Sequence, residues 1–123
     1  SNNGDSESQF ILGEIYYLGK LVSRDIDKSI HYLTLSANQK NRKAQFLLGL
    51  IYYLGEYVPR DINRSIEYLK RSSNQGDNDA QYILGEIYFH GQYVERNIKL
   101  SIHYLTLSAK QNNRSSQFFL GQI

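Results

Sequence analysis

The chain contains no cysteine, methionine or tryptophan, and its one proline is Pro59. Without cysteine there is no disulfide framework and no thiolate metal site, which favours a reducing compartment. No apolar run approaches the roughly 18 residues of a membrane-spanning helix, and we see no signal peptide. The net charge is +2, with basic and acidic residues interleaved, so no basic stripe indicates nucleic-acid binding. We therefore expect a cytoplasmic protein that binds neither nucleic acid nor membranes.

Glycine, isoleucine and tyrosine recur at a fixed interval of 36 residues. An interval between about 20 and 50 residues is the signature of a solenoid or array of repeats. One unit alone cannot cover its apolar face, so neighbouring units must stack. The positions that keep this interval include Gly13, Gly49, Gly85 and Gly121; Gly19, Gly55 and Gly91; Ile15, Ile51, Ile87 and Ile123; Tyr16, Tyr52 and Tyr88; and Tyr32, Tyr68 and Tyr104.

Each unit is predicted to hold two helices, which we call helix A and helix B. In the second unit Asn41 is a good N-cap for helix A, and Gly55 suits the left-handed residue that ends it. Asp61 then caps helix B, which we expect to run to about Asn74. The link to the next helix A is so short that neighbouring helices must be antiparallel. The equivalent positions are Asp5, Asp77 and Asn113 for the other A caps, Gly19 and Gly91 for the A ends, Asp25 and Asn97 for the B caps, and Asn38 and Lys110 for the B ends. The pattern predicts six helices, part of a seventh, and no strand.

Gly13, Gly49, Gly85 and Gly121 lie inside the predicted A helices, where glycine costs about 1 kcal/mol relative to alanine. A cost that recurs at a fixed interval needs a physical reason. We predict that a neighbouring helix approaches these positions too closely for a Cβ atom. Small residues recur in helix B and support such an approach: Ser29, Ser65 and Ser101; Ser36, Ser72 and Ser108; and Ala37, Ser73 and Ala109.

The unit resembles a Sel1-like repeat, the 36-residue relative of the tetratricopeptide repeat. In the second unit the resemblance rests on Ala44, Leu48, Gly49, Tyr52, Gly55, Val58, Asp61, Ser65, Tyr68 and Gly76. It extends over units at about 5–40, 41–76 and 77–112 and a partial unit at 113–123, which we interpret as one domain within a segment of a longer chain. Two departures are the serines of helix B, where the family has alanine, and the residues Lys40 and Asn112 in place of Gly76. The resemblance implies an all-α fold, a right-handed α/α superhelix (solenoid) whose A helices line a concave face that contacts other proteins.

The side of helix A opposite Leu48 and Gly49 is centred near residues 47, 50 and 54. Residue type varies between units at two of these register positions, so stacking does not dictate the choice. We predict that this side forms the concave, partner-binding face. The predicted site residues are Glu14, Tyr17, Leu18, Leu50, Tyr53, Leu54, Glu86, Phe89 and His90.

Tyr17, Tyr53 and Phe89 would form an aromatic ladder along this face. Aromatic side chains supply the large contact area favoured at binding hot spots. The alternative is that these rings only pack between adjacent A helices. Both interpretations remain open from the sequence.

The predicted function is protein–protein interaction, with a protein or peptide as the partner. The alternative is a structural or self-associating segment, because the last helix carries an apolar surface that could pair with a second copy. The apolar residues of that helix are Phe118, Phe119, Leu120 and Ile123. Enzyme activity is a third class, but no nucleophile, paired carboxylates or phosphate-binding loop supports it, so we expect neither catalysis nor a cofactor.

Three other features have ordinary explanations. His31, His90 and His103 lack the spacing of a helical metal pair, so we expect no metal site. Arg24, Arg60 and Arg96 precede the helix B caps and are predicted to anchor the loop, although a row of guanidinium groups could also bind an acidic partner. The tripeptides that begin at Asn63 and Asn113 match the glycosylation acceptor pattern, which leaves a lumenal location open.

Overall fold

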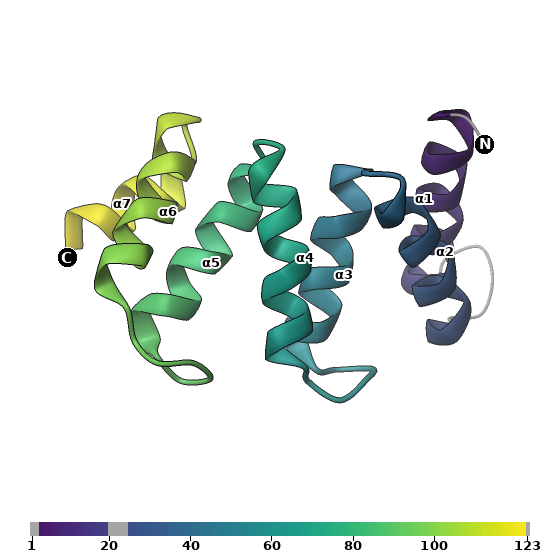
Figure 1. The fold of residues 1–123 in the computed structure, drawn as a ribbon, viewed down its shortest axis with the longest axis horizontal. Coiled ribbons are helices and arrows are strands. Elements are labelled where there is room, and N and C mark those ends of the chain that lie inside the picture. The colour runs from purple at the N-terminus through teal and green to yellow at the C-terminus, as the bar shows by residue number, and fades with distance from the viewer. Residues whose placement is uncertain (1–2, 20–24, 123) are drawn as a thin grey trace.

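The computed structural model describes residues 3–19 and 25–122, which form seven α-helices and no strand. The A helices are α1 (Asn3–Leu18), α3 (Arg42–Leu54), α5 (Asn78–His90) and α7 (Arg114–Gln122). The B helices are α2 (Ile26–Asn38), α4 (Ile62–Asn74) and α6 (Ile98–Lys110). Figure 1 shows them stacked along one axis, with α1 and α7 at opposite ends. The predicted all-α solenoid is confirmed. None of the described helices has the length and apolar character needed to cross a bilayer.

The predicted helix ends are confirmed in the second and third units. The Asn41 side chain accepts a hydrogen bond from the Ala44 amide, and Asp61 accepts one from the Arg64 amide. Gly55 ends α3 in the left-handed conformation, with φ of 64°. Such caps satisfy the amides and carbonyls that a helix leaves without intrahelical partners at its ends.

The predicted cap at Asp5 is wrong, because α1 already begins at Asn3. Asn41 lies at the end of a turn that follows α2, and its amide donates to the Ser36 carbonyl at 3.2 Å. That turn fixes where α3 starts.

Glycine permits close contact between the two helices of one unit, as predicted for Gly13, Gly49 and Gly85; the prediction is wrong for Gly121, where a Cβ atom would meet nothing within 4 Å. A Cβ atom on Gly49 would lie 2.7 Å from the Cγ of Leu69, which is fully buried in α4. Gly13 has the same relation to Leu33, with 2.6 Å between the two atoms. No side chain larger than hydrogen fits at these positions unless helix B moves away.

The helix B serines are buried and bonded to the facing A helix. Ser65 Oγ donates to the carbonyl of Gly49 at 2.7 Å, and Ser72 Oγ donates to the carbonyl of Arg42 at 3.1 Å. A buried hydroxyl is costly only when it lacks a partner. Serine therefore replaces alanine here without leaving a polar group unpaired.

The apolar core lies between units, as the stacking argument requires. One cluster joins Leu33 of α2 to Leu48 and Ile51 of α3, and a second joins Leu69 of α4 to Leu84 of α5. Val58 and Val94 of the loops pack against these clusters, so these apolar loop residues fold back onto the helices.

Buried glutamines also link the units, a feature that the sequence analysis missed. Gln45 donates through Nε2 to the Ala37 carbonyl at 3.2 Å and accepts from Gln75 at 2.8 Å. Gln81 and Gln111 repeat the same pair one unit later. The signal was present, since glutamine recurs at the 36-residue interval at both positions.

Tyrosine packs within each unit. The rings of Tyr16 and Tyr32 are stacked with 6.1 Å between centroids.

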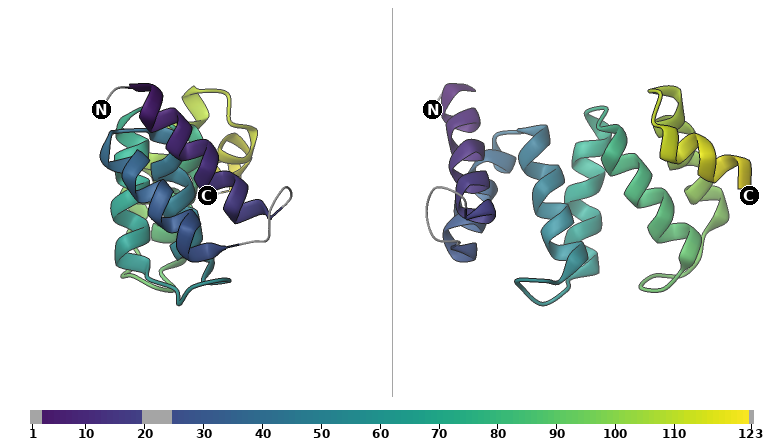
Figure 2. Two further views of the ribbon diagram at one scale, coloured as in Figure 1. Left: turned by 90° about the vertical axis from the view of Figure 1, so that its right-hand side faces the viewer. Right: turned by 180° about the vertical axis from the view of Figure 1, so that it is seen from behind.

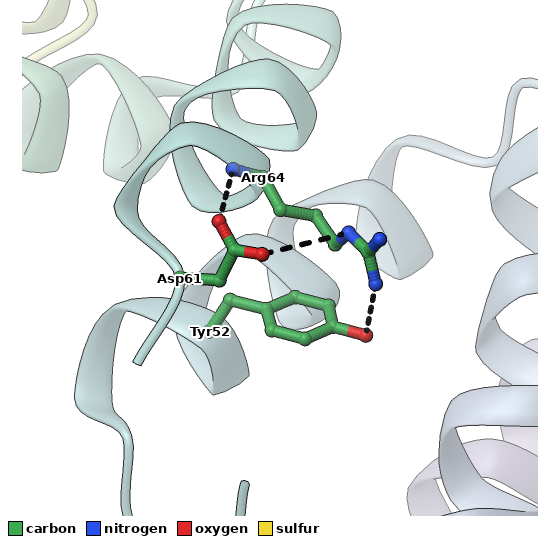
Figure 3. A network of polar contacts seen from close by, with 3 residues as sticks. All are labelled: Tyr52, Asp61 and Arg64. Carbon is green, nitrogen blue, oxygen red and sulfur yellow. Dashed lines mark hydrogen bonds and ion pairs between the residues drawn. The ribbon is translucent and has the colours of Figure 1, made fainter. Parts of the chain in front are cut away.

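In the second unit Arg64 joins the helix B cap to helix A (Figure 3): its backbone amide donates to Asp61, and its guanidinium donates to the Tyr52 hydroxyl at 3.3 Å. That hydrogen bond raises the pKa of Arg64. The recurring tyrosines are therefore packing residues with a polar tip.

Candidate partner-binding surface

The predicted site residues lie on α1, α3 and α5. At both ends of the array the two kinds of helix occupy different layers: α2 and α6 lie in front in Figure 1, whereas α1 and α7 lie in front when the molecule is seen from behind in Figure 2. The buried residues of α3 include Ala44, Leu48 and Ile51. Leu54, close to the opposite side of that helix, is 43% exposed.

A cleft of about 450 Å³ crosses three successive A helices. Its walls include Phe10 and Glu14 from α1 and Lys43, Phe46 and Leu47 from α3. The third wall comes from the start of α5 and the turn before it, at Gly76, Asp77, Asn78 and Asp79. Apolar rings therefore alternate with charged groups of both signs along one surface.

Among the predicted site residues, only Glu14 lines this cleft. The predicted face was centred on the second half of helix A, so Phe10, Lys43 and Phe46 were not among the predicted site residues. These residues lie on the same side one turn earlier, because positions four apart share a helix face. That spacing was the signal that could have found them.

The aromatic ladder residues lie at the junctions between units. Tyr17 meets Tyr57 of the next unit edge to face, with 5.8 Å between centroids, and Tyr53 meets Tyr93 in the same way at 6.5 Å. Tyr17 and Tyr53 also pack against the two apolar clusters. The ring of Phe89 meets that of Phe119 in α7, with 5.0 Å between the two centroids. These half-buried rings take part in stacking, whether or not they also meet a partner.

Leu18, Leu54 and His90 share one register position at the end of helix A and are exposed in all three units. Leu18 and Leu54 are each 43% exposed. Glu14, Leu50 and Glu86 share the other variable position and are half-buried. This surface therefore runs on from the cleft toward the loop end of the A helices.

Two of the three repeated arginines anchor the loop, as predicted. Arg60 donates through Nε to the Tyr53 carbonyl at 2.9 Å and through Nη2 to the Leu54 carbonyl at 3.3 Å. Arg96 donates to the Phe89 carbonyl at 2.9 Å. Both guanidinium groups satisfy carbonyls at the C-terminal end of helix A. Arg24 lies outside the described residues.

The Glu86 carboxylate perturbs two tyrosines around it. The Tyr82 hydroxyl donates to Glu86 Oε2 at 3.1 Å. Burial, followed by the charge of Glu86, raises the pKa of Tyr82 and also that of Tyr53, which comes from the preceding unit. In the described part of the chain, the ion pairs are Arg64 with Asp61 and Arg71 with Glu67, so Glu86 has no cationic partner there. Within the same residues no group of three potential metal ligands comes together.

The sequence profile of the Sel1 repeat matches residues 6–41, 42–77 and 78–113. The chain belongs to the Sel1 repeat family. The profile places each boundary one residue later than the units defined above. Sel1 repeat proteins generally act as protein-interaction scaffolds and are generally non-catalytic.

Solved structures resemble this Sel1 repeat chain over nearly its whole length. A Sel1 repeat protein from Oxalobacter formigenes is 29% identical, with a TM-score of 0.86 over 98% of this chain and 90% of that one. A protective antigen present in uropathogenic Escherichia coli strains, which displays the same fold, is 34% identical with a TM-score of 0.89, and the match spans 97% of this chain but only 26% of that one.

Cysteine rich protein B of Helicobacter pylori shares the fold alone, at 18% identity and a TM-score of 0.73, with 97% of each chain covered. A comparison with curated protein sequences finds no match.

Proposed function

We propose that this Sel1 repeat array binds an extended segment of another protein along the exposed side of its A helices. The observation that carries the proposal is the cleft of about 450 Å³, whose walls come from three successive units. A recess with apolar walls and a few charged groups is the usual form of a binding site. Because the cleft crosses the units, a ligand that fills it would run along the stack.

The chemistry of the cleft favours a peptide with mixed character. Phe10, Phe46 and Leu47 offer apolar contact, while Glu14 and Lys43 offer charges of opposite sign. Leu54 extends the apolar surface beyond the cleft. Apolar anchors surrounded by polar groups are typical of peptide and protein interfaces.

The test is to select peptides from a random display library on the immobilised chain and to measure their affinity for variants. Lys43→Glu and Leu54→Asp change exposed groups on the proposed face and are expected to weaken the selected peptides at least about tenfold, equivalent to roughly 1.4 kcal/mol. Leu35→Asp is the matched control, because Leu35 is 38% exposed on helix B. If Leu35→Asp weakens the affinity of the selected peptides and the other two variants do not, the peptides bind on the side of the B helices.

Self-association is the second candidate, and it rests on α7. Phe118 is 72% exposed and lines a depression of about 310 Å³ together with Phe89, Phe119 and Gln122. Phe118→Asp should abolish any concentration-dependent increase in mass measured by sedimentation velocity. A wild-type chain that stays monomeric at high concentration would remove this candidate and leave peptide binding untouched.

A further inference from the structure

Glu86 of α5 lies beside aromatic side chains of its own and the preceding unit, and α7 adds a ring next to one of them. Tyr82, one turn earlier, donates its hydroxyl to Glu86 Oε2 at 3.1 Å. The ring of Phe119 from α7 meets Tyr82 edge to face, with 6.4 Å between centroids, and meets Phe89 at 5.0 Å. Tyr53 approaches from the preceding unit, close enough for the Glu86 charge to act on its phenol. The Glu86 side chain is thus half-buried beside these aromatic residues.

Two arginines that contact these or neighbouring residues have partners of their own. Arg60 bonds the Tyr53 carbonyl, and its Cζ lies 4.6 Å from the centroid of the Tyr93 ring. Arg96 bonds the Phe89 carbonyl, with its Cζ 5.1 Å from the centroid of that ring. Among the described residues, the Tyr82 hydroxyl is the hydrogen-bond partner found for the Glu86 side chain. A partly desolvated carboxylate gains most from a cation when no protein group neutralises it.

In the first unit, the carboxylate at the equivalent position shares a cleft with a lysine. Glu14 occupies the register position of Glu86, and Phe10 occupies that of Tyr82. Lys43 of the following unit lines the cleft with Glu14, and its Nζ lies 6.0 Å from the centroid of the Phe10 ring. Two units later, the residue in register with Lys43 is Ser115, which is exposed and carries no charge. A lysine thus lines the same cleft as Glu14, whereas the residue in register with that lysine two units later is an uncharged serine.

We propose that Glu86, with the rings of Tyr82 and Phe119, forms a subsite for the ammonium group of a lysine side chain in the bound segment. A carboxylate pairs with the charge, and an aromatic ring within about 6 Å attracts a cation. Lysine fits better than arginine because its charge is compact, whereas a guanidinium binds best to two free carboxylate oxygens and Oε2 already accepts the Tyr82 hydroxyl. This subsite rests on the proposed function, since it names one chemical group of the peptide.

The experiment titrates n-butylammonium chloride, which mimics the lysine side chain, into the whole chain and follows the aromatic resonances by NMR. Saturable shifts are expected at Tyr82 and Phe119, with 1-butanol, the neutral analogue, giving much smaller ones. Glu86→Gln should weaken binding at least fivefold, and Glu14→Gln, the matched control, should leave the Tyr82 and Phe119 shifts unchanged. Ser115→Lys should supply an internal ammonium group and abolish these shifts. Circular dichroism verifies that each variant is folded.

Equal shifts with butanol, an unaffected Glu86→Gln variant, or no saturable shift at all would each overturn the subsite. None of these results decides the proposed function, because the selected peptides report on the face around Lys43 and Leu54. Conversely, loss of peptide binding to that face with intact butylammonium binding would leave an isolated ammonium site and remove the peptide proposal.

Discussion

At the scale of single residues, the glycine inside helix A determines how closely the two helices of a unit pack. The sequence predicts a close approach at Gly49, but the atom that approaches is known only from the structure, where Leu69 occupies the space of the missing Cβ. Leu69 is fully buried and cannot turn away into solvent. Its backbone nitrogen, 3.3 Å from the same point, limits movement further.

Gly49→Ala should therefore destabilise the fold, although alanine is the better helix former. Overpacking costs about 1–3 kcal/mol, against a propensity gain of about 1 kcal/mol, so a net loss of about 1 kcal/mol is expected in urea unfolding. Gly121→Ala is the matched control, because a Cβ there meets nothing within 4 Å. That variant should gain up to about 1 kcal/mol. If both variants were more stable than the wild type, helix B would be able to move away from position 49 at little cost in free energy.

Ser116 of α7 carries the buried side-chain oxygen that lacks a hydrogen-bond partner among the described residues. Ala44 and Ala80 fill the same register position in the preceding units. Ser116→Ala should stabilise the protein by about 1 kcal/mol, since it removes an unsatisfied hydroxyl. Thermal unfolding measures the gain. Ser65→Ala is the contrasting variant: its hydroxyl bonds the Gly49 carbonyl, so its removal should be destabilising.

At the scale of elements, local signals placed most helix ends correctly. Asn41, Gly55 and Asp61 each act within one turn of their own position, so they need no knowledge of the rest of the chain. Asp5 failed because the start of a helix A depends on the turn that precedes it. The residues that end that turn, Lys40, Gly76 and Asn112, all adopt positive φ, at 67°, 88° and 66°.

Lys40→Gly should stabilise the turn between α2 and α3. A residue with a Cβ in the left-handed region costs about 1 kcal/mol or more, which glycine avoids, so a gain of about 1 kcal/mol is expected in chemical unfolding. Asn112→Gly should gain less, because asparagine tolerates this conformation better than lysine does. A neutral or destabilising Lys40→Gly would mean that the Lys40 side chain contributes contacts that outweigh the backbone strain.

At the scale of the whole molecule, stability depends on contacts between units. Burial raises the pKa of Tyr53, Tyr82 and Tyr104, and the charge of Glu86 adds to the effect for the first two. The folded chain therefore holds these phenol protons more tightly than the unfolded chain. These protonated phenols contribute fully to the free energy of unfolding below pH 10, the ordinary pKa of tyrosine. The contribution is lost as the pH rises above that pKa.

Urea unfolding should accordingly show that the free energy of unfolding falls above pH 10. Ultraviolet absorbance should show that phenolate forms at a higher pH in the folded protein than in the unfolded protein. Tyr82→Phe should lose less stability over this range than the wild type does. Glu86→Gln should shift the Tyr82 pKa back toward the ordinary value. An unchanged alkaline profile in both variants would mean that the Glu86 charge does not reach the Tyr82 phenol.

The sequence by itself determined the period and the helix-loop-helix unit, because caps, glycines and apolar spacing act over one or two turns. It could not determine which side chains from different units meet. The cleft around Phe10 and Lys43, and the rings of Tyr53 and Phe119 around Glu86, were decided by the stacking of units. Such contacts join residues far apart in the chain and depend on the angle and distance between helices, which no local pattern specifies.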